Sequence, residues 1–183
     1  MDLTYLVSAL EPESWPKPKL PEIAVAGRSN VGKSTFLNLL AGKKLAKVSS
    51  IPGKTQRMQF FQAENCVIVD LPGYGYAKAP AALQAEWSEK VHAYLEERIV
   101  LKKLILLLDI RRIPTTDDLQ FVEWASRNPS KELLLVWTKT DLLSKTECER
   151  QEKKILEALL PYHVTEIPLS VPAPRRVVWK RVW

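Results

Sequence analysis

Apolar segments of two kinds alternate along this chain. Uninterrupted apolar runs predict buried strands, and two short runs on either side of a turn at Glu64–Asn65 predict a strand pair. The expected strands are Leu3–Val7, Glu22–Ala26, Met58–Ala63, Cys66–Asp70, Lys103–Asp109, Glu132–Trp137 and Val164–Leu169. Apolar residues spaced about 3.6 residues apart, or cap residues, predict the helices. These are Lys33–Leu40, Ala82–Val100, Thr116–Arg127, a helix from the Ser144 cap to Leu160, and Arg175–Trp183.

The order of these elements predicts the fold class. Apolar strands separated by helices are typical of a parallel sheet covered on both faces. We therefore expect a three-layer α/β fold, with a mostly parallel sheet and helices on both faces. At 183 residues the chain is close to the length of one domain, about 150 residues, so residues 1–183 are expected to form a single domain. Its N-terminal strand and proline-rich connector would occupy 1–21, and its core 22–183.

Composition narrows the class of protein. The chain has 183 residues, 46% hydrophobic and 26% charged, which is ordinary for a globular protein. Its two cysteines, Cys66 and Cys148, exclude a scaffold of several disulfides. No apolar run approaches the roughly 18 residues that a membrane span needs, and the first residues lack a basic secretion signal. We therefore expect a cytoplasmic protein with no membrane partner.

The first chemical motif lies between an expected strand and an expected helix. The pattern G-x-x-x-x-G-K-[ST] is matched by Gly27, Arg28, Ser29, Asn30, Val31, Gly32, Lys33 and Ser34, with Thr35 next. At ordinary residue usage such a match arises by chance in well under ~1% of chains of this size. Glycines let the backbone wrap phosphates, Lys33 can neutralise the outer phosphates, and Ser34 can ligate magnesium. The motif predicts a phosphate-binding loop.

A second motif begins where the strand Cys66–Asp70 ends. It consists of Asp70, Leu71, Pro72 and Gly73. A carboxylate here can hold a magnesium ion through water, and the Gly73 amide can contact a terminal phosphate. An acid after an apolar strand is common, and Asp109, which has the same setting, is interpreted as a strand-end acid. Its combination with the upstream phosphate loop distinguishes Asp70.

A third motif follows the strand Glu132–Trp137, at the sheet edge where open α/β folds bind ligands. Its residues are Thr138, Lys139, Thr140 and Asp141. A carboxylate at Asp141 can accept hydrogen bonds from the N1–H and 2-amino group of guanine, which adenine does not offer. Lys139 would lay its aliphatic stem over the ring. In this order after the other two motifs, it predicts recognition of guanine.

These motifs resemble those of the translation-factor-like GTPases, and within them the EngB (YihA/YsxC) family. The similar segments are Leu20–Thr35, Pro52–Gln56, Asp70–Ala77 and Thr138–Asp141, and the resemblance covers nearly the whole chain. It implies a P-loop NTPase G domain that binds GTP and GDP with Mg²⁺. It further implies a nucleotide switch in assembly of the bacterial large ribosomal subunit. The implied partner is the precursor of that subunit, which consists of ribosomal RNA and ribosomal proteins. Normal cell division and septation are also implied.

The resemblance assigns further residues by position. It makes Ser34 and Thr55 the magnesium ligands, and Gly53–Gln56 the switch that closes on the γ-phosphate. The nucleotide-binding residues that it adds are Gly53, Lys54, Thr55, Gln56, Arg57, Leu169, Ser170 and Val171. Ser170 would fall in a loop that touches the base. The sequence departs from the family after Ser170, because Pro172 and Pro174 follow where the family has a second serine and a longer terminal helix.

Another departure concerns hydrolysis. Tyr74 stands where many GTPases have a glutamine that orients the attacking water. Tyrosine cannot orient water in the same way, so we expect slow intrinsic hydrolysis, accelerated by a partner such as a ribosomal particle, and assign no catalytic base. Asn30 is the residue type that helps some related GTPases bind a potassium ion near the transition state. We therefore hypothesise that potassium binds as a second cation in addition to magnesium.

The basic residues favour a polyanionic partner without identifying it. The chain has 27 lysines and arginines against 21 acids, a net charge of +6. Basic residues flank the expected switch at Lys43, Lys44, Lys47, Lys54 and Arg57, and others lie at Arg111–Arg112 and near the C-terminus. Solvated helix ends explain these positions as well as contact with RNA does.

Two other functional classes share some of these features. A P-loop kinase or ATPase acting on a small molecule would use Gly27–Ser34, but it has no use for Thr138–Asp141 and needs a substrate lid that the sequence does not show. A pure RNA-binding module leaves the phosphate loop unexplained. A GTP-dependent switch accounts for all three motifs.

Overall fold

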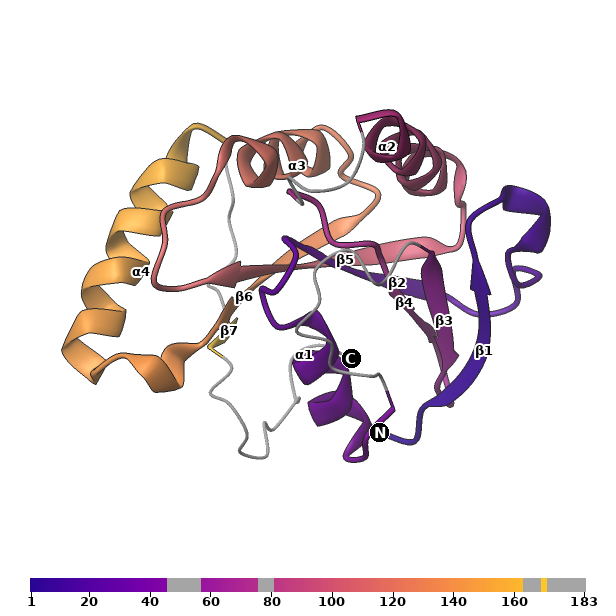
Figure 1. The fold of residues 1–183 in the computed structure, drawn as a ribbon, viewed down its shortest axis with the longest axis horizontal. Helices are drawn as coiled ribbons and strands as arrows, with labels where there is room; N and C mark the ends of the chain where they lie inside the picture. The colour runs from indigo at the N-terminus through magenta and orange to yellow at the C-terminus, as the bar shows by residue number, and fades with distance from the viewer. Residues whose placement is uncertain (46–56, 76–80, 163–168, 171–183) are drawn as a thin grey trace.

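The computed structural model describes residues 1–45, 57–75, 81–162 and 169–170, the side chains of 81–88 and 169–170 excepted. Within these ranges seven strands form one sheet in the order β1-β3-β4-β2-β5-β6-β7 (Figure 1). The strands are β1 (Thr4–Ala9), β2 (Glu22–Gly27), β3 (Met58–Gln62), β4 (Val67–Asp70), β5 (Leu101–Asp109), β6 (Glu132–Thr138) and β7 (Leu169–Ser170). The α-helices are α1 (Lys33–Ala41), α2 (Ala81–Glu97), α3 (Thr116–Ser126) and α4 (Lys145–Leu159). Three short 3-10 helices are η1 (Pro12–Ser14), η2 (Thr140–Leu142) and η3 (Leu160–Tyr162).

The sheet is mostly parallel, as the sequence predicts. β2 pairs in parallel with β4 and β5, and β6 pairs in parallel with β5 and β7. β3 is antiparallel to both β1 and β4. The short turn between β3 and β4 requires this, because a tight turn joins only antiparallel strands and a parallel pair needs a longer crossover.

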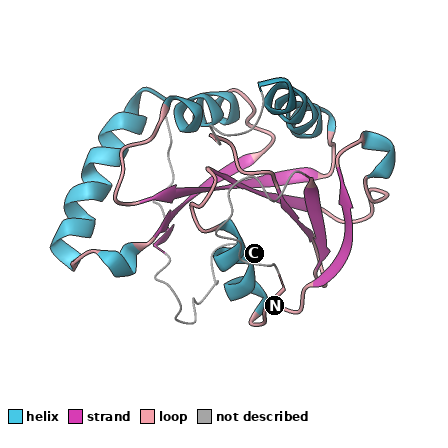
Figure 2. Cartoon of the chain, in the orientation of Figure 1, coloured by secondary structure: helices cyan, strands magenta, loops and turns pink. Residues whose placement is uncertain are grey.

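Helices cover both faces of the sheet, which confirms the expected three layers (Figure 2). On one face, Phe36, Leu37 and Leu40 of α1 pack in a buried cluster with Ile23 and Val25 of β2. The opposite face of β2 presents residues that pack with α2, α3 and α4. That cluster includes Ala24, Ala26, Tyr94, Leu95, Val122, Ala125, Ile155 and Leu159. β2 is therefore buried along its whole length, which explains its lack of polar alternation.

Some element boundaries differ from the predicted ones. α2 ends at Glu97, before the expected end at Val100, and β5 begins at Leu101. The chain turns there, with the Leu101 N–H donating to the Arg98 carbonyl oxygen at 3.0 Å, and the buried Arg98 guanidinium pairs with the Glu22 carboxylate at 2.6 Å. Of the predicted strand Val164–Leu169, only Leu169 is described, and it begins β7. The predicted helix Arg175–Trp183 lies outside the described residues.

The strand register determines where the motifs meet. Asp70 at the end of β4 lies opposite Val25 of β2, and Asp109 at the end of β5 lies opposite Thr138 of β6. Because the carboxyl ends of parallel strands share one edge, the segments that follow β2, β4, β5 and β6 emerge together. None of the helices in the described part of the chain is long and apolar enough to cross a membrane.

Candidate functional site

The loop from β2 to α1 has the backbone shape that its glycines predict. Gly27 has a φ of 146°, and a Cβ there would lie 2.8 Å from the Leu107 carbonyl oxygen. Gly32, the residue before α1, has a φ of 116°, and the exposed Asn30 has a φ of 62°. Glycine tolerates the first two values without steric penalty, and asparagine is one of the few other residues that adopt the left-handed conformation. The loop therefore turns tightly against β5 and leads directly into the N-terminus of α1.

Lys33 lies beneath this loop and is 9% exposed. Its Nζ donates hydrogen bonds to the carbonyl oxygens of Gly27, at 3.1 Å, and Arg28, at 3.5 Å. Burial lowers the pKa of Lys33, and the nearby Asp70 carboxylate opposes that shift. The ammonium group is thus held by the loop itself, in the first turn of α1, where helix N–H groups favour anions.

Asp70 faces the same region from the end of β4. It is 2% exposed, and among the described residues its Oδ1 has no hydrogen-bond partner. Burial raises the pKa of Asp70 to about 6 against the opposing effect of Lys33. A buried carboxylate oxygen without a partner carries a large desolvation penalty. A divalent cation would supply the missing partner, so the residues present fit a magnesium site.

The loop after Asp70 packs directly on the phosphate-binding loop. The Ser29 N–H donates to the Tyr74 carbonyl oxygen at 2.9 Å, and Arg28 and Tyr74 form an isolated parallel bridge. A Cβ on Gly73 would lie 2.7 Å from Lys33 Nζ and 3.0 Å from Ser29 Cα. Any side chain at position 73 would therefore collide with the two parts of the loop that face it.

The third motif closes the site at the end of β6. The Thr138 hydroxyl donates to the Leu108 carbonyl oxygen at 3.2 Å, which ties the motif to β5. Lys139 has the left-handed backbone conformation, with a φ of 62°, and Asp141 is exposed within η2. Lys139 Nζ lies 2.9 Å from Asp109 Oδ2. The structure thus leaves the Asp141 carboxylate accessible and holds the Lys139 ammonium toward the β2–α1 loop side of the sheet.

Asp109 takes part in this arrangement, which the sequence analysis did not predict. Besides Lys139, it accepts hydrogen bonds from Arg111 through the backbone N–H at 3.2 Å, Nε at 2.9 Å and Nη2 at 2.7 Å. Burial acts to raise the pKa of Asp109, but these hydrogen bonds outweigh it and hold the pKa well below its usual range. Asp109 does end β5, as predicted, and its described partners are the side chains of Arg111 and Lys139. The contact of Asp109 with Lys139 follows from the position of Asp109 opposite Thr138. That position depends on the strand register, which the sequence does not give.

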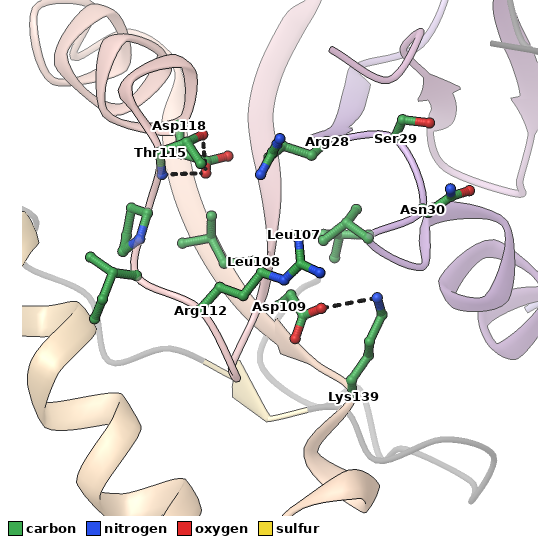
Figure 3. Close-up of a pocket in the computed structure, with 13 residues that line it drawn as sticks. Arg28, Ser29, Asn30, Leu107, Leu108, Asp109, Arg112, Thr115, Asp118 and Lys139 are labelled. Carbon is green, nitrogen blue, oxygen red and sulfur yellow. Dashed lines mark hydrogen bonds and ion pairs between the residues drawn. The ribbon is translucent and has the colours of Figure 1, made fainter. Parts of the chain in front are cut away.

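A cavity of about 200 Å³ lies between the β2–α1 loop and the connection from β5 to α3 (Figure 3). Several predicted residues line it: Arg28, Ser29, Asn30, Val31 and Lys139. The others are Leu107, Leu108, Asp109, Arg112, Ile113, Pro114, Thr115 and Asp118. Figure 3 shows the basic side chains of Arg28, Arg112 and Lys139 around the opening. The lining therefore combines three basic side chains, the acids Asp109 and Asp118, and the apolar Leu107 and Leu108 of β5.

Comparison with known proteins decides the family. Residues 22–139 match the family described as 50S ribosome-binding GTPase. The probable GTP-binding protein EngB of Citrifermentans bemidjiense is 47% identical to this chain, over 85% of this chain and 73% of the relative. The probable GTP-binding protein EngB of Pelobacter propionicus is 43% identical, over 97% of this chain and 90% of the relative. The chain belongs to the EngB family of GTPases. Its EngB-type motifs are thus those of a P-loop GTP-binding protein, and the alternative of a small-molecule kinase or ATPase is not favoured.

Solved structures agree with the EngB fold. A crystal structure of a probable GTP-binding protein EngB aligns with a TM-score of 0.63 at 23% identity, over 82% of this chain and 87% of that one. Era of Aquifex aeolicus bound to GDP and AlF₄⁻ aligns with a TM-score of 0.62 at 22% identity, over 84% of this chain and 50% of Era. At these identities the likeness concerns the fold, and it confirms the predicted P-loop G-domain architecture.

Several predicted nucleotide-binding residues of this EngB chain lie outside the described residues. These are Gly53, Lys54, Thr55, Gln56 and Val171. Arg57 is described and is exposed just before β3. Ser170 was expected in a loop after the last strand, and this was wrong, because its backbone belongs to β7 and lies opposite Trp137. Parallel pairing with β6 extends the strand to Ser170 and brings it beside the third motif.

Tyr74 has partners that the sequence did not reveal. Its hydroxyl donates to Asp118 Oδ1 at 2.6 Å, and its ring stacks on Phe121 of α3 with centroids 6.5 Å apart. Burial, and then the negative charge of Asp118, raise the pKa of the Tyr74 phenol far above its usual range. Tyr74 is therefore a neutral hydrogen-bond donor directed at α3.

Proposed function

We propose that this EngB-family chain is a nucleotide switch that binds GTP and GDP with Mg²⁺ at the edge formed by the segments after β2, β4 and β6. The observation that carries the proposal is the contact between the phosphate-binding loop and the segment after β4: Ser29 N–H donates to the Tyr74 carbonyl oxygen at 2.9 Å, and a Cβ on Gly73 would lie 2.7 Å from Lys33 Nζ. The nucleotide-binding residues are those predicted from the sequence. Residues 1–183 would form one EngB-type G domain.

Magnesium would be held by Ser34, by Thr55 and, through water, by Asp70. The unpartnered Asp70 oxygen supports this role, and Thr55 lies outside the described residues. When bound, the ion neutralises charge on the phosphates. The chain's own contribution is to hold the Lys33 ammonium and the Asp70 carboxylate away from bulk water, where their electrostatic effect on a bound phosphate is stronger than in solution.

Guanine recognition is tested with fluorescent nucleotides. The full chain is expected to bind GDP more tightly than ADP in the presence of magnesium. Asp141→Asn exchanges an acceptor for a donor, so it should shift the preference from guanine toward xanthine. Because Asp141 is exposed, its substitution should leave the melting temperature of the nucleotide-free protein nearly unchanged. Tighter binding of ADP than of GDP by the wild type would contradict the proposal.

We propose that intrinsic GTP hydrolysis is slow and that a partner accelerates it. The hydrogen bond from Tyr74 to Asp118 supports this, because it directs the phenol toward α3. Asn30 is exposed beside the cavity, which is compatible with the hypothesis that it helps to bind potassium. Turnover compared in potassium and sodium buffers tests that hypothesis. Equal rates would eliminate it.

The proposed partner is a precursor of the large ribosomal subunit. We also propose that this chain is cytoplasmic and is associated with normal cell division and septation. The description of the matching family as 50S ribosome-binding supports the partner. Era, a neighbour in fold, has been solved with MgGDPNP and nucleotides 1506–1542 of 16S ribosomal RNA. The test is co-sedimentation of this chain with large ribosomal subunits, compared between a GTP analogue and GDP. If basic residues contact RNA, binding should weaken steeply as salt rises. Equal binding without dependence on nucleotide would contradict a switch.

A further inference from the structure

The backbone and the side chain of Tyr74 are hydrogen-bonded to different parts of the site. Its carbonyl oxygen accepts from Ser29 N–H in the phosphate-binding loop, and its hydroxyl donates to Asp118 in the first turn of α3. Asp118 is 4% exposed, and its second oxygen accepts from Thr115 N–H at 2.8 Å and Thr115 Oγ1 at 2.7 Å. Asp118 therefore caps α3 and holds Tyr74 with the same carboxylate.

The next residue, Gly75, is packed closely between the same two elements. Gly75 has a φ of 71°, and a Cβ there would lie 2.9 Å from Arg28 Nε and 3.4 Å from Asp117 Oδ2. The chain at Gly75 thus passes through a narrow space between a basic side chain of the phosphate-binding loop and an acidic side chain of α3. Figure 3 shows Arg28 and Asp118 on opposite sides of the cavity, on the β2–α1 loop and on α3. Residues 74 and 75 bridge these two elements.

The bridge holds Gly73 against the groups that would meet the γ-phosphate. The space between Gly73 and its neighbours does not accept one more carbon atom, since a Cβ would lie 2.7 Å from Lys33 Nζ and 3.0 Å from Ser29 Cα. A γ-phosphate that contacts both Lys33 and the Gly73 amide needs an oxygen between them. Binding of GTP must therefore separate the Lys33 ammonium from Gly73 by movement of one or the other, and Gly73 is the one whose neighbour, Tyr74, is held by α3. GDP lacks the γ-phosphate and does not require this separation.

We propose that Tyr74 is a positioning residue that holds Gly73 closed over Lys33 and so favours GDP over GTP. This inference rests on the proposed function, because it concerns the two nucleotides at the same site. The hydrogen bond between Tyr74 and Asp118, together with stacking on Phe121, stabilises the closed position. A ligand shifts such an equilibrium only through its different affinity for the two positions. Contact of a partner with α3 that disrupts the Asp118 bond would then favour GTP.

The test compares Tyr74→Phe with Tyr94→Phe in the full chain. Tyr74→Phe removes the hydroxyl and retains a ring that can stack on Phe121. Tyr94 is the matched control, because its hydroxyl also donates to a carboxylate, Glu22 Oε2 at 2.7 Å, but lies on α2 in the core. The measured quantity is the ratio of the Kd for a non-hydrolysable GTP analogue to the Kd for GDP, with magnesium.

Tyr74→Phe is expected to lower this ratio by about tenfold, the size expected when one hydrogen bond to a charged group stops opposing the open position. Asp118→Asn should shift the ratio in the same direction, and Tyr94→Phe should leave it unchanged. An unchanged or raised ratio in Tyr74→Phe, or an equal fall in Tyr94→Phe, would overturn the inference. If the wild type binds neither nucleotide, the proposed function fails as well. Wild-type binding with an unaltered variant ratio contradicts this inference alone.

Discussion

Asp70 is the residue in which the conflict between folding and function is clearest. A fully buried carboxylate with an oxygen that lacks a described partner destabilises the folded protein when it is ionised. Burial raises its pKa from an ordinary value of 3.8 to about 6, although Lys33 opposes the shift. The folded protein therefore holds a proton at Asp70 at pH values where the unfolded chain has released it. Its contribution to stability is present below pH 4 and is lost as the pH rises through about 6.

Asp70→Asn should consequently stabilise the nucleotide-free protein at pH 7.5 while weakening magnesium-dependent nucleotide binding. The expected gain in the free energy of unfolding is about 1 to 3 kcal/mol, from the conversion of a pKa shift into energy. Urea unfolding at pH 7.5 and pH 4 measures it, and the gain should be smaller at pH 4. A variant that is less stable than the wild type at both pH values would show that the ionised carboxylate has a stabilising partner.

At the scale of single elements, caps determine where helices begin. Ser144 accepts a hydrogen bond from the Glu147 N–H at 3.3 Å, and the Glu147 carboxylate accepts from the Ser144 N–H at 2.8 Å. Thr115 and Asp118 form the same box on α3. The box satisfies N–H groups that a helix start leaves without partners. Because these signals lie within a few residues, the sequence predicts both helix starts well.

Ser144→Ala should lower the melting temperature by about 2 to 4 °C, since it removes one cap from a chain of this size. Thr146→Ala is the control, because Thr146 is exposed in the first turn of the same helix and is not the capping residue. Its melting temperature should stay close to that of the wild type. Thermal unfolding followed by circular dichroism distinguishes the two. Equal melting temperatures for both variants would show that the cap contributes nothing.

On the scale of the whole molecule, a buried polar cluster joins three distant segments. Arg98 donates from Nε and Nη2 to Glu22 at 3.0 Å and 2.6 Å, and from Nη2 to the Pro16 carbonyl oxygen at 2.6 Å. Tyr94 donates to the same carboxylate. The Arg98 guanidinium also lies over the Trp15 ring, 5.7 Å from its centroid. The N-terminal connector, β2 and α2 are therefore held together by the Arg98–Glu22 ion pair and the hydrogen bonds around it.

Arg98→Met should destabilise the protein by about 3 to 5 kcal/mol, because it leaves the Glu22 charge buried without its cation. Adding Glu22→Gln should recover at least half of the loss, since the neutral amide can still accept from Tyr94. Arg127→Met is the control and should change stability little, because the Arg127 pair with Glu123 is exposed. Urea unfolding measures all three. A double variant as unstable as the single one would contradict the proposed cause.

Within the described residues, the sequence by itself determined β1 to β6, the starts of the α-helices and the three motifs, because each depends on residues close together in the chain. Apolar runs, cap residues and glycine spacing act locally, and they predicted β2, α1 and the loop between them correctly. Only the tertiary structure placed Asp109 beside Lys139, joined Tyr74 to Asp118, and extended β7 to Ser170. These contacts depend on strand order, register and helix packing, which bring together residues that local pattern cannot relate. The same folding leaves Asp70 buried with an unpartnered oxygen next to Lys33, which no property of either residue alone could predict.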